Sequence, residues 1–203
     1  AENMSFAPIV ASGPNGSMPH AVPTDRKIQD GDFVTMDFGC IYQGYCSDMT
    51  RTVPVNGKFT PRQRAVYESV LNMMTYAKKI LRPGILKSEY ERLVRVFAAG
   101  ELVKLGLITP AQVAEKPSDP PIVRKYYMHG CSHFLGLDVH DVGEANPVVL
   151  PGMVFTVEPG IYIAEEGIGI RLENDVLIGE TENIDLLGDV PLLPDDIERL
   201  MAR

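Results

Sequence analysis

Two pairs of acidic residues lie inside segments that otherwise favour β-strands. Asp37 and Asp48 flank the turn-like residues 42–45, and Glu158 and Glu173 flank a second turn-like segment at 165–167. A hairpin over either segment brings its two carboxylates to one face of a sheet. Any fold that forms both hairpins must therefore accommodate four carboxylates on apolar strands, where unpaired negative charge is costly.

The exact register of each hairpin stays open. A turn centred between residues 42 and 43 places Asp37 directly opposite Asp48, whereas one centred on 43 and 44 leaves both on one face. For Glu158 and Glu173, a centre between residues 165 and 166 pairs them directly, and a centre on 166 and 167 keeps them facing together.

The acidic pairs have an ordinary explanation and a chemical one. Either pair could face solvent or form ion pairs with Arg51 or Arg171. A neighbourhood of about four negative charges, however, is poorly neutralised by one arginine and well neutralised by two divalent cations. The presence of two such pairs in one chain favours a metal site.

Three of the four histidines fall within residues 126–143, at His129, His133 and His140. The spacing of His129 and His133 is that of a helical zinc pair, but Gly130 and the absence of an H-E-x-x-H glutamate argue against that motif. We expect at least one of these histidines to bind metal. Four carboxylates and one imidazole suit manganese, cobalt, iron or zinc.

Periodicity predicts two helices and several strands. One helix is expected from Thr60-Pro61 to Pro83-Gly84, and another from Ser88, with Glu91 completing a capping box, to Gly106. Residues 109–121 read as a loop-like connection. The remaining apolar segments alternate as antiparallel hairpins do, so the chain is expected to be of the α+β class.

Composition limits the possible functions. A chain of 203 residues with 45% apolar content can form one core, and a net charge of −8 disfavours nucleic acid and anionic membranes as partners. No apolar stretch approaches the roughly 20 residues that span a bilayer. We therefore expect a cytoplasmic protein that binds neither nucleic acid nor membrane.

Four sequence blocks resemble the pita-bread metallopeptidases, in particular the Xaa-Pro aminopeptidase and prolidase branch. They are MDFGCIYQGYCSDMTRTVPVNGKFT, HGCSHFLGLDVHDVG, FTVEPGIYI and GIGIRLEND. The resemblance implies a pita-bread catalytic domain over residues 1–203, with a curved antiparallel sheet flanked by helices. It also implies that the helices and separate N-terminal domain that commonly precede this region in the family are absent. The metal ligands that it implies are Asp37, Asp48, His133, Glu158 and Glu173.

The resemblance also implies an activity. Two divalent ions, with manganese favoured over zinc, cobalt or iron, would present a bridging hydroxide to the peptide bond before a proline at the second position of a peptide. Glu158 would carry the proton, His140 with His129 would stabilise the oxyanion, His20 would lie near the scissile bond, and Arg171 would support the carboxylates. A homo-oligomer, or association with the missing N-terminal part, is expected.

Three other functions remain open at this point. A prolidase restricted to dipeptides shares the fold and the ligands, although Ser132 favours the aminopeptidase. A non-catalytic module of the same fold that binds other proteins is the second. A creatinase-like hydrolase without the metal pair is the third, and the retained Asp37, Asp48 and Glu173 argue against it.

Overall fold

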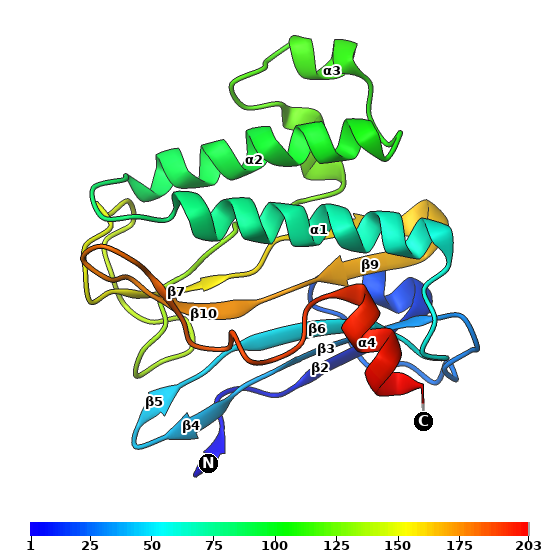
Figure 1. Ribbon diagram of the computed structural model, residues 1–203, viewed down its shortest axis with the longest axis horizontal. Coiled ribbons are helices and arrows are strands. Elements are labelled where there is room, and N and C mark those ends of the chain that lie inside the picture. The colour runs from blue at the N-terminus through cyan, green and yellow to red at the C-terminus, as the bar shows by residue number, and fades with distance from the viewer. Residues whose placement is uncertain (203) are drawn as a thin grey trace.

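A computed structural model describes residues 1–202 of the protein (Figure 1). The chain folds into antiparallel strands covered on one side by two long helices, α1 and α2, so the expected α+β class is confirmed. The helices are α1 Pro61–Ile80, α2 Lys87–Lys104, α3 Pro110–Ala114 and α4 Pro194–Met201, with 3₁₀ turns η1 Gly13–Ser17, η2 Pro121–Lys125 and η3 Ala164–Glu166. The strands are β1 Asn3–Met4, β2 Ile9–Ser12, β3 Phe33–Phe38, β4 Cys40–Tyr42, β5 Tyr45–Cys46, β6 Met49–Pro54, β7 Val154–Val157, β8 Gly160–Ile163, β9 Ile168–Arg171, β10 Asn174–Leu177 and β11 Ile184–Asp185.

Helix α1 forms where the sequence predicts it. The Thr60 hydroxyl accepts a hydrogen bond from Gln63 N, and the Gln63 side chain accepts one from Thr60 N, which satisfies two of the free N–H groups at the start of the helix. The helix ends at Ile80, before Pro83-Gly84. Its buried face packs on the β7–β9 layer, with α2 lying alongside it (Figure 1).

The helices described within residues 1–202 include none with the length and apolar character of a membrane span.

Two local predictions are wrong. Helix α2 begins at Lys87, after the uncapped Leu86, and the predicted capping box at Ser88 does not form. Glu91 instead binds backbone N–H groups of a neighbouring loop, a stronger use of a largely buried carboxylate. The 109–121 connection is not all loop, because Thr109 and Gln112 cap the short helix α3.

The first acidic hairpin adopts the second of the two expected registers. Its turn lies at Gln43–Gly44, where both residues have positive φ, and β3 pairs with β6 so that Asp37 faces Thr50. Direct pairing of Asp37 with Asp48 is therefore wrong. The two aspartates still share one face, because Asp48 lies two residues before Thr50.

The second acidic hairpin has the register in which Glu158 and Glu173 are directly opposite. Strands β8 and β9 pair Gly160 with Arg171, and strands β7 and β10 pair Val157 with Asn174. The two ladders pair residues with the same offset. Glu158 and Glu173 lie between the ladders and fit that offset, so they are opposite each other. The connection is made by η3 and by Gly167, whose φ of 62° is the left-handed conformation that glycine tolerates best.

The two hairpins meet along β6 and β9. Thr52 Oγ1 donates to Arg171 O at 3.0 Å, and Glu173 N donates to Thr50 O at 3.1 Å. At Gly169, a Cβ atom would lie 1.8 Å from the carbonyl oxygen of Gly16, so a larger residue would push the segments apart. These contacts bring all four acidic positions to one side of the joined strands.

Candidate metal centre

A cavity of about 560 Å³ opens where the two hairpins meet the histidine-containing segment. Every residue predicted from the sequence as a ligand or catalytic group lines it. These residues are His20, Asp37, Asp48, His129, His133, His140, Glu158, Arg171 and Glu173. The structure therefore brings together side chains that are up to 153 positions apart in the sequence.

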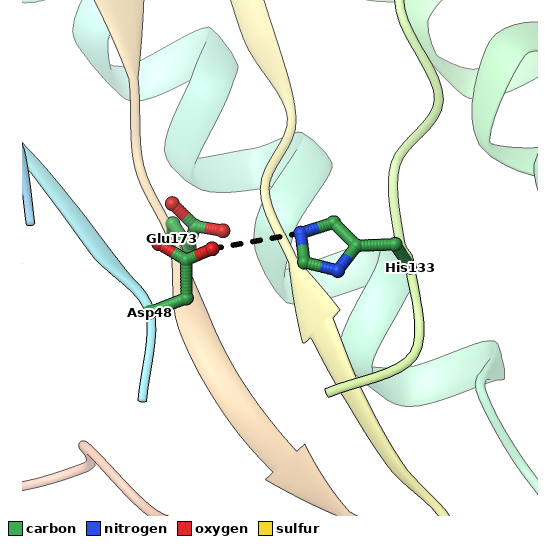
Figure 2. A group of neighbouring side chains, drawn as sticks. All are labelled: Asp48, His133 and Glu173. Carbon is green, nitrogen blue, oxygen red and sulfur yellow. Dashed lines mark ion pairs between the residues drawn. The ribbon is translucent and has the colours of Figure 1, made fainter. Parts of the chain in front are cut away.

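Asp48, His133 and Glu173 form a compact group of potential metal ligands in the cavity (Figure 2). One ligand atom from each lies within 4.8 Å of the others, and the three residues come from three separate segments. His133 Nε2 lies 3.5 Å from Asp48 Oδ2 and 3.6 Å from Glu158 Oε1. Because His133 Nδ1 donates to Phe134 O at 2.8 Å, Nε2 is the ring nitrogen that faces the carboxylates.

Arginine neutralises part of this negative charge. Arg171 Nη2 contacts Asp37 Oδ2 at 2.5 Å, so the ion-pair interpretation is correct for Asp37. Arg51 is directed elsewhere and donates to the carbonyl oxygens of Thr50 and Glu173. Glu173 Oε2 accepts a hydrogen bond from the Thr50 hydroxyl at 2.6 Å, so this partner is uncharged. Among residues 1–202, no lysine or arginine forms an ion pair with Asp48, Glu158 or Glu173.

The electrostatics of the cavity show an excess of negative charge. Burial raises the pKa of Glu158 to about 7, with the charges of Asp48 and Asp37 adding to the effect. Burial and the neighbouring carboxylates raise the pKa of Glu173 well above its usual value. Burial lowers the pKa of His133, but the hydrogen bond to Asp48 and the charge of Glu158 outweigh it, so the net pKa is raised. Each shift favours the arrangement that carries less negative charge.

The residues present fit divalent ions. Within residues 1–202, Asp37 Oδ1 and Asp48 Oδ1 are buried without a hydrogen-bond partner, which is costly unless something else binds them. Carboxylate oxygens with one imidazole form a donor set typical of manganese, iron, cobalt or zinc. Asp37, Asp48, His133, Glu158 and Glu173 are the residues that would hold such ions.

The other histidines have different surroundings. The ring of His140 stacks on that of His133, with 3.9 Å between centroids, and both line the cavity with His20. His129 Nδ1 donates to Gly130 O at 2.7 Å, so its Nε2 accepts from the Tyr162 hydroxyl at 2.8 Å. Burial lowers the pKa of His129 to about 4, which keeps it neutral near pH 7.

Tyr162 belongs to the site, although the sequence alone favours a packing role for it. Its hydroxyl connects His129 to Arg171, whose Nη1 donates to it at 3.1 Å. Its position four residues after Glu158 in EPGIY is the signal that points to it. A strand tyrosine is more often a core residue, so the sequence does not distinguish the two roles.

Comparison with known proteins identifies the family. The model of metallopeptidase family M24 matches residues 1–180. The chain belongs to this family. Among curated members, the Xaa-Pro aminopeptidase of Escherichia coli is 44% identical over 98% of this chain and 47% of its own length. Xaa-Pro aminopeptidase 3 of Rattus norvegicus is 36% identical over 100% of this chain and 42% of its own length.

Solved structures of M24 members confirm the pita-bread fold. Proline aminopeptidase P II from Yersinia pestis superimposes with a TM-score of 0.90 at 42% identity, covering 98% of this chain and 48% of that chain. Zinc-substituted aminopeptidase P of E. coli in complex with product gives a TM-score of 0.89 at 41% identity, with the same coverage. The chain spans about half the length of the relatives it matches.

Proposed function

We propose that this M24 chain carries the metal centre of an Xaa-Pro aminopeptidase and releases the N-terminal residue that precedes proline. The observation that carries the proposal is the gathering of Asp48, Glu158 and Glu173 around His133, without a lysine or arginine partner among residues 1–202. The aminopeptidase names of the relatives favour this substrate class over the dipeptides of a prolidase.

The chemistry follows from the placement of each group. Two bound divalent ions would supply Lewis-acid activation of water for attack on a peptide carbonyl. Glu158 is the candidate proton carrier toward the departing proline nitrogen, because its carboxylate lines the cavity in which the peptide bond would lie. Its carboxylate lies beside His133, at the wall of the cavity.

The histidines divide the remaining tasks. His140 lines the cavity and is the candidate donor to the developing oxyanion. His129 has both ring nitrogens engaged, so we assign it the orientation of the Tyr162 hydroxyl in place of direct oxyanion contact. Arg171 holds Asp37 and the same hydroxyl, and His20 lines the cavity where the scissile bond would lie.

We propose manganese as the native ion, because the donor set is rich in oxygen. Zinc is the second candidate, and one relative has been studied in zinc-substituted form. We further propose that the protein is cytoplasmic. We also propose that it forms a homo-oligomer or associates with a further segment. The relatives include a mitochondrial peptidase of Arabidopsis thaliana, so location is best decided by fractionation.

The decisive experiment measures release of the N-terminal residue from Ala-Pro and from a longer Xaa-Pro peptide, by metal-stripped protein with and without added Mn²⁺. Manganese-dependent cleavage of both peptides supports the aminopeptidase. Cleavage of the dipeptide alone identifies a prolidase. Mn²⁺ binding without cleavage of either peptide would indicate that activity requires association with the further segment.

A further inference from the structure

The segment that carries His133 has no regular secondary structure, although it delivers a side chain to the centre of the cavity. Residues 128–133 form no helix or strand. One side of the segment binds the β7 hairpin, because Glu158 N donates to Cys131 O at 2.8 Å and Thr156 N donates to His133 O at 3.1 Å. The N–H of His133 also binds this hairpin, donating to Thr156 Oγ1 at 3.1 Å, whereas the N–H groups of Cys131 and Ser132 face the other way.

Helix α2 holds the N–H groups of Cys131 and Ser132. Glu91 Oε2 accepts from Cys131 N at 2.8 Å, and Glu91 Oε1 accepts from Ser132 N at 3.2 Å. The side chain of Glu91 is only 15% exposed, and Lys87 Nζ lies 3.0 Å from its carboxylate. Hydrogen bonds from backbone N–H groups to an ionised carboxylate are among the stronger ones in proteins.

The neighbouring residue on α2 strengthens this attachment. The Tyr90 hydroxyl lies 2.9 Å from Ser132 Oγ and 3.3 Å from Cys131 Sγ, and Tyr90 is fully buried. The segment is therefore held between two rigid elements, α2 on one side and the β7 hairpin on the other. A shift of this segment would carry His133 with it.

We propose that Glu91 is a positioning residue for the metal centre: through the N–H groups of Cys131 and Ser132, it holds the His133 imidazole against the carboxylates of Asp48 and Glu158. The role as a metal centre rests on the proposed function, whereas the attachment of the segment does not. Glu91 lines no part of the cavity and touches no reacting group.

The test compares two isosteric substitutions on the same helix. Glu91→Gln puts an amide donor against at least one of the two N–H groups, whereas Glu101→Gln alters a buried carboxylate that contacts Asn72 and Lys104. Amide hydrogen exchange in the metal-free protein and Mn²⁺ affinity by calorimetry are measured for each. Glu91→Asp, which keeps the charge on a side chain one methylene shorter, is a second variant in case Glu91→Gln folds poorly.

In Glu91→Gln we expect severalfold faster exchange at Cys131 and Ser132 and Mn²⁺ binding weakened by about tenfold or more, the usual effect of removing an outer partner of a metal ligand. Glu101→Gln should change neither quantity, even if it lowers the melting temperature. Unchanged exchange at Cys131 and Ser132 in Glu91→Gln overturns the inference. So does Mn²⁺ affinity that stays at the wild-type value.

The two proposals fail in different ways. If the wild-type protein binds no Mn²⁺, the proposed function is contradicted, and the exchange rates alone decide whether Glu91 holds the segment. If the wild-type protein binds Mn²⁺ and the two glutamine variants bind it equally well, the positioning role is wrong and the proposed function stands.

Discussion

At the residue scale, the cavity holds buried carboxylates whose arrangement disfavours the folded state when no cation is bound. Asp37 has Arg171 as its partner, whereas Glu173 accepts a hydrogen bond from the Thr50 hydroxyl and is repelled by the neighbouring carboxylates. Such groups are retained in proteins where they perform a task that offsets their cost. Their effect on stability should therefore change sign when divalent ions bind.

Replacing Glu173 with glutamine tests this change of sign. The metal-free Glu173→Gln protein should melt at or above the wild-type temperature, because glutamine lacks the ionised form that burial and the neighbouring carboxylates disfavour, while the shape and the contact with Thr50 are kept. Added Mn²⁺ should raise its melting temperature less than that of the wild type, since stabilisation by a ligand follows its affinity. Differential scanning fluorimetry with and without Mn²⁺ measures both. An equal Mn²⁺ shift in the two proteins would remove Glu173 from the ligand set.

At the element scale, we expect the same capping motif to contribute differently to the stability of the protein in two helices. Thr60–Gln63 and Thr109–Gln112 both form complete capping boxes. Helix α1 has 20 residues and buries one of its own faces in the core, whereas α3 has five residues, none of them buried. A helix cap contributes to global stability only to the extent that its helix packs against the rest of the molecule.

Matched threonine substitutions separate these cases. Thr60→Ala should lower the free energy of unfolding by about 1 kcal/mol, the typical value of an N-cap hydroxyl. Thr109→Ala should change it by less than about 0.5 kcal/mol, as expected for an exposed cap on a helix that buries none of its residues. Urea denaturation followed by circular dichroism gives both values. Equal losses in the two variants would contradict the link between capping and packing.

At the scale of the whole molecule, the metal-free protein should depend on pH through its buried acids. Burial raises the pKa of Glu158 from 4.5 and that of Asp175 from 3.8, each to about 7. Near neutral pH the folded protein therefore holds protons that the unfolded chain has already released. Stability then falls as pH rises through the folded pKa values. His129 acts in the opposite direction, with its pKa lowered from 6.5 to about 4, so its contribution is complete above about pH 6.5.

The predicted result is a loss of stability of the chelator-treated protein between about pH 6.5 and about pH 8. With saturating Mn²⁺, the trend should weaken or reverse, because metal ions favour the ionised carboxylates and bind more tightly as protons leave. Urea titrations at several pH values, with EDTA or with Mn²⁺, measure both trends. Metal-free stability that does not change over this interval would show that the carboxylates are already ionised in the folded protein without a cation.

The sequence by itself determined the two long helices and the two acidic hairpins, apart from the start of α2 and the register of the first hairpin. Hairpin pairing and helical periodicity are local, so either centre of the second hairpin puts Glu158 and Glu173 on one face, and the structure has the centre that places them directly opposite. The resemblance to the pita-bread metallopeptidases supplied the roles of His20, His129, His140 and Arg171, which line the same cavity as the five predicted ligands.

The tertiary structure alone decided which partner each of these groups has. A capping box at Ser88 and Glu91 is a sound local prediction, yet Glu91 binds Cys131 and Ser132, about 40 positions away in the sequence. Arg171 and Arg51 are equally suitable cations by residue type, and only the joining of β6 to β9 directs the first to Asp37 and the second to the Glu173 carbonyl. The physical reason is that buried polar groups take whichever partner packing brings within reach, and packing is a property of the whole chain.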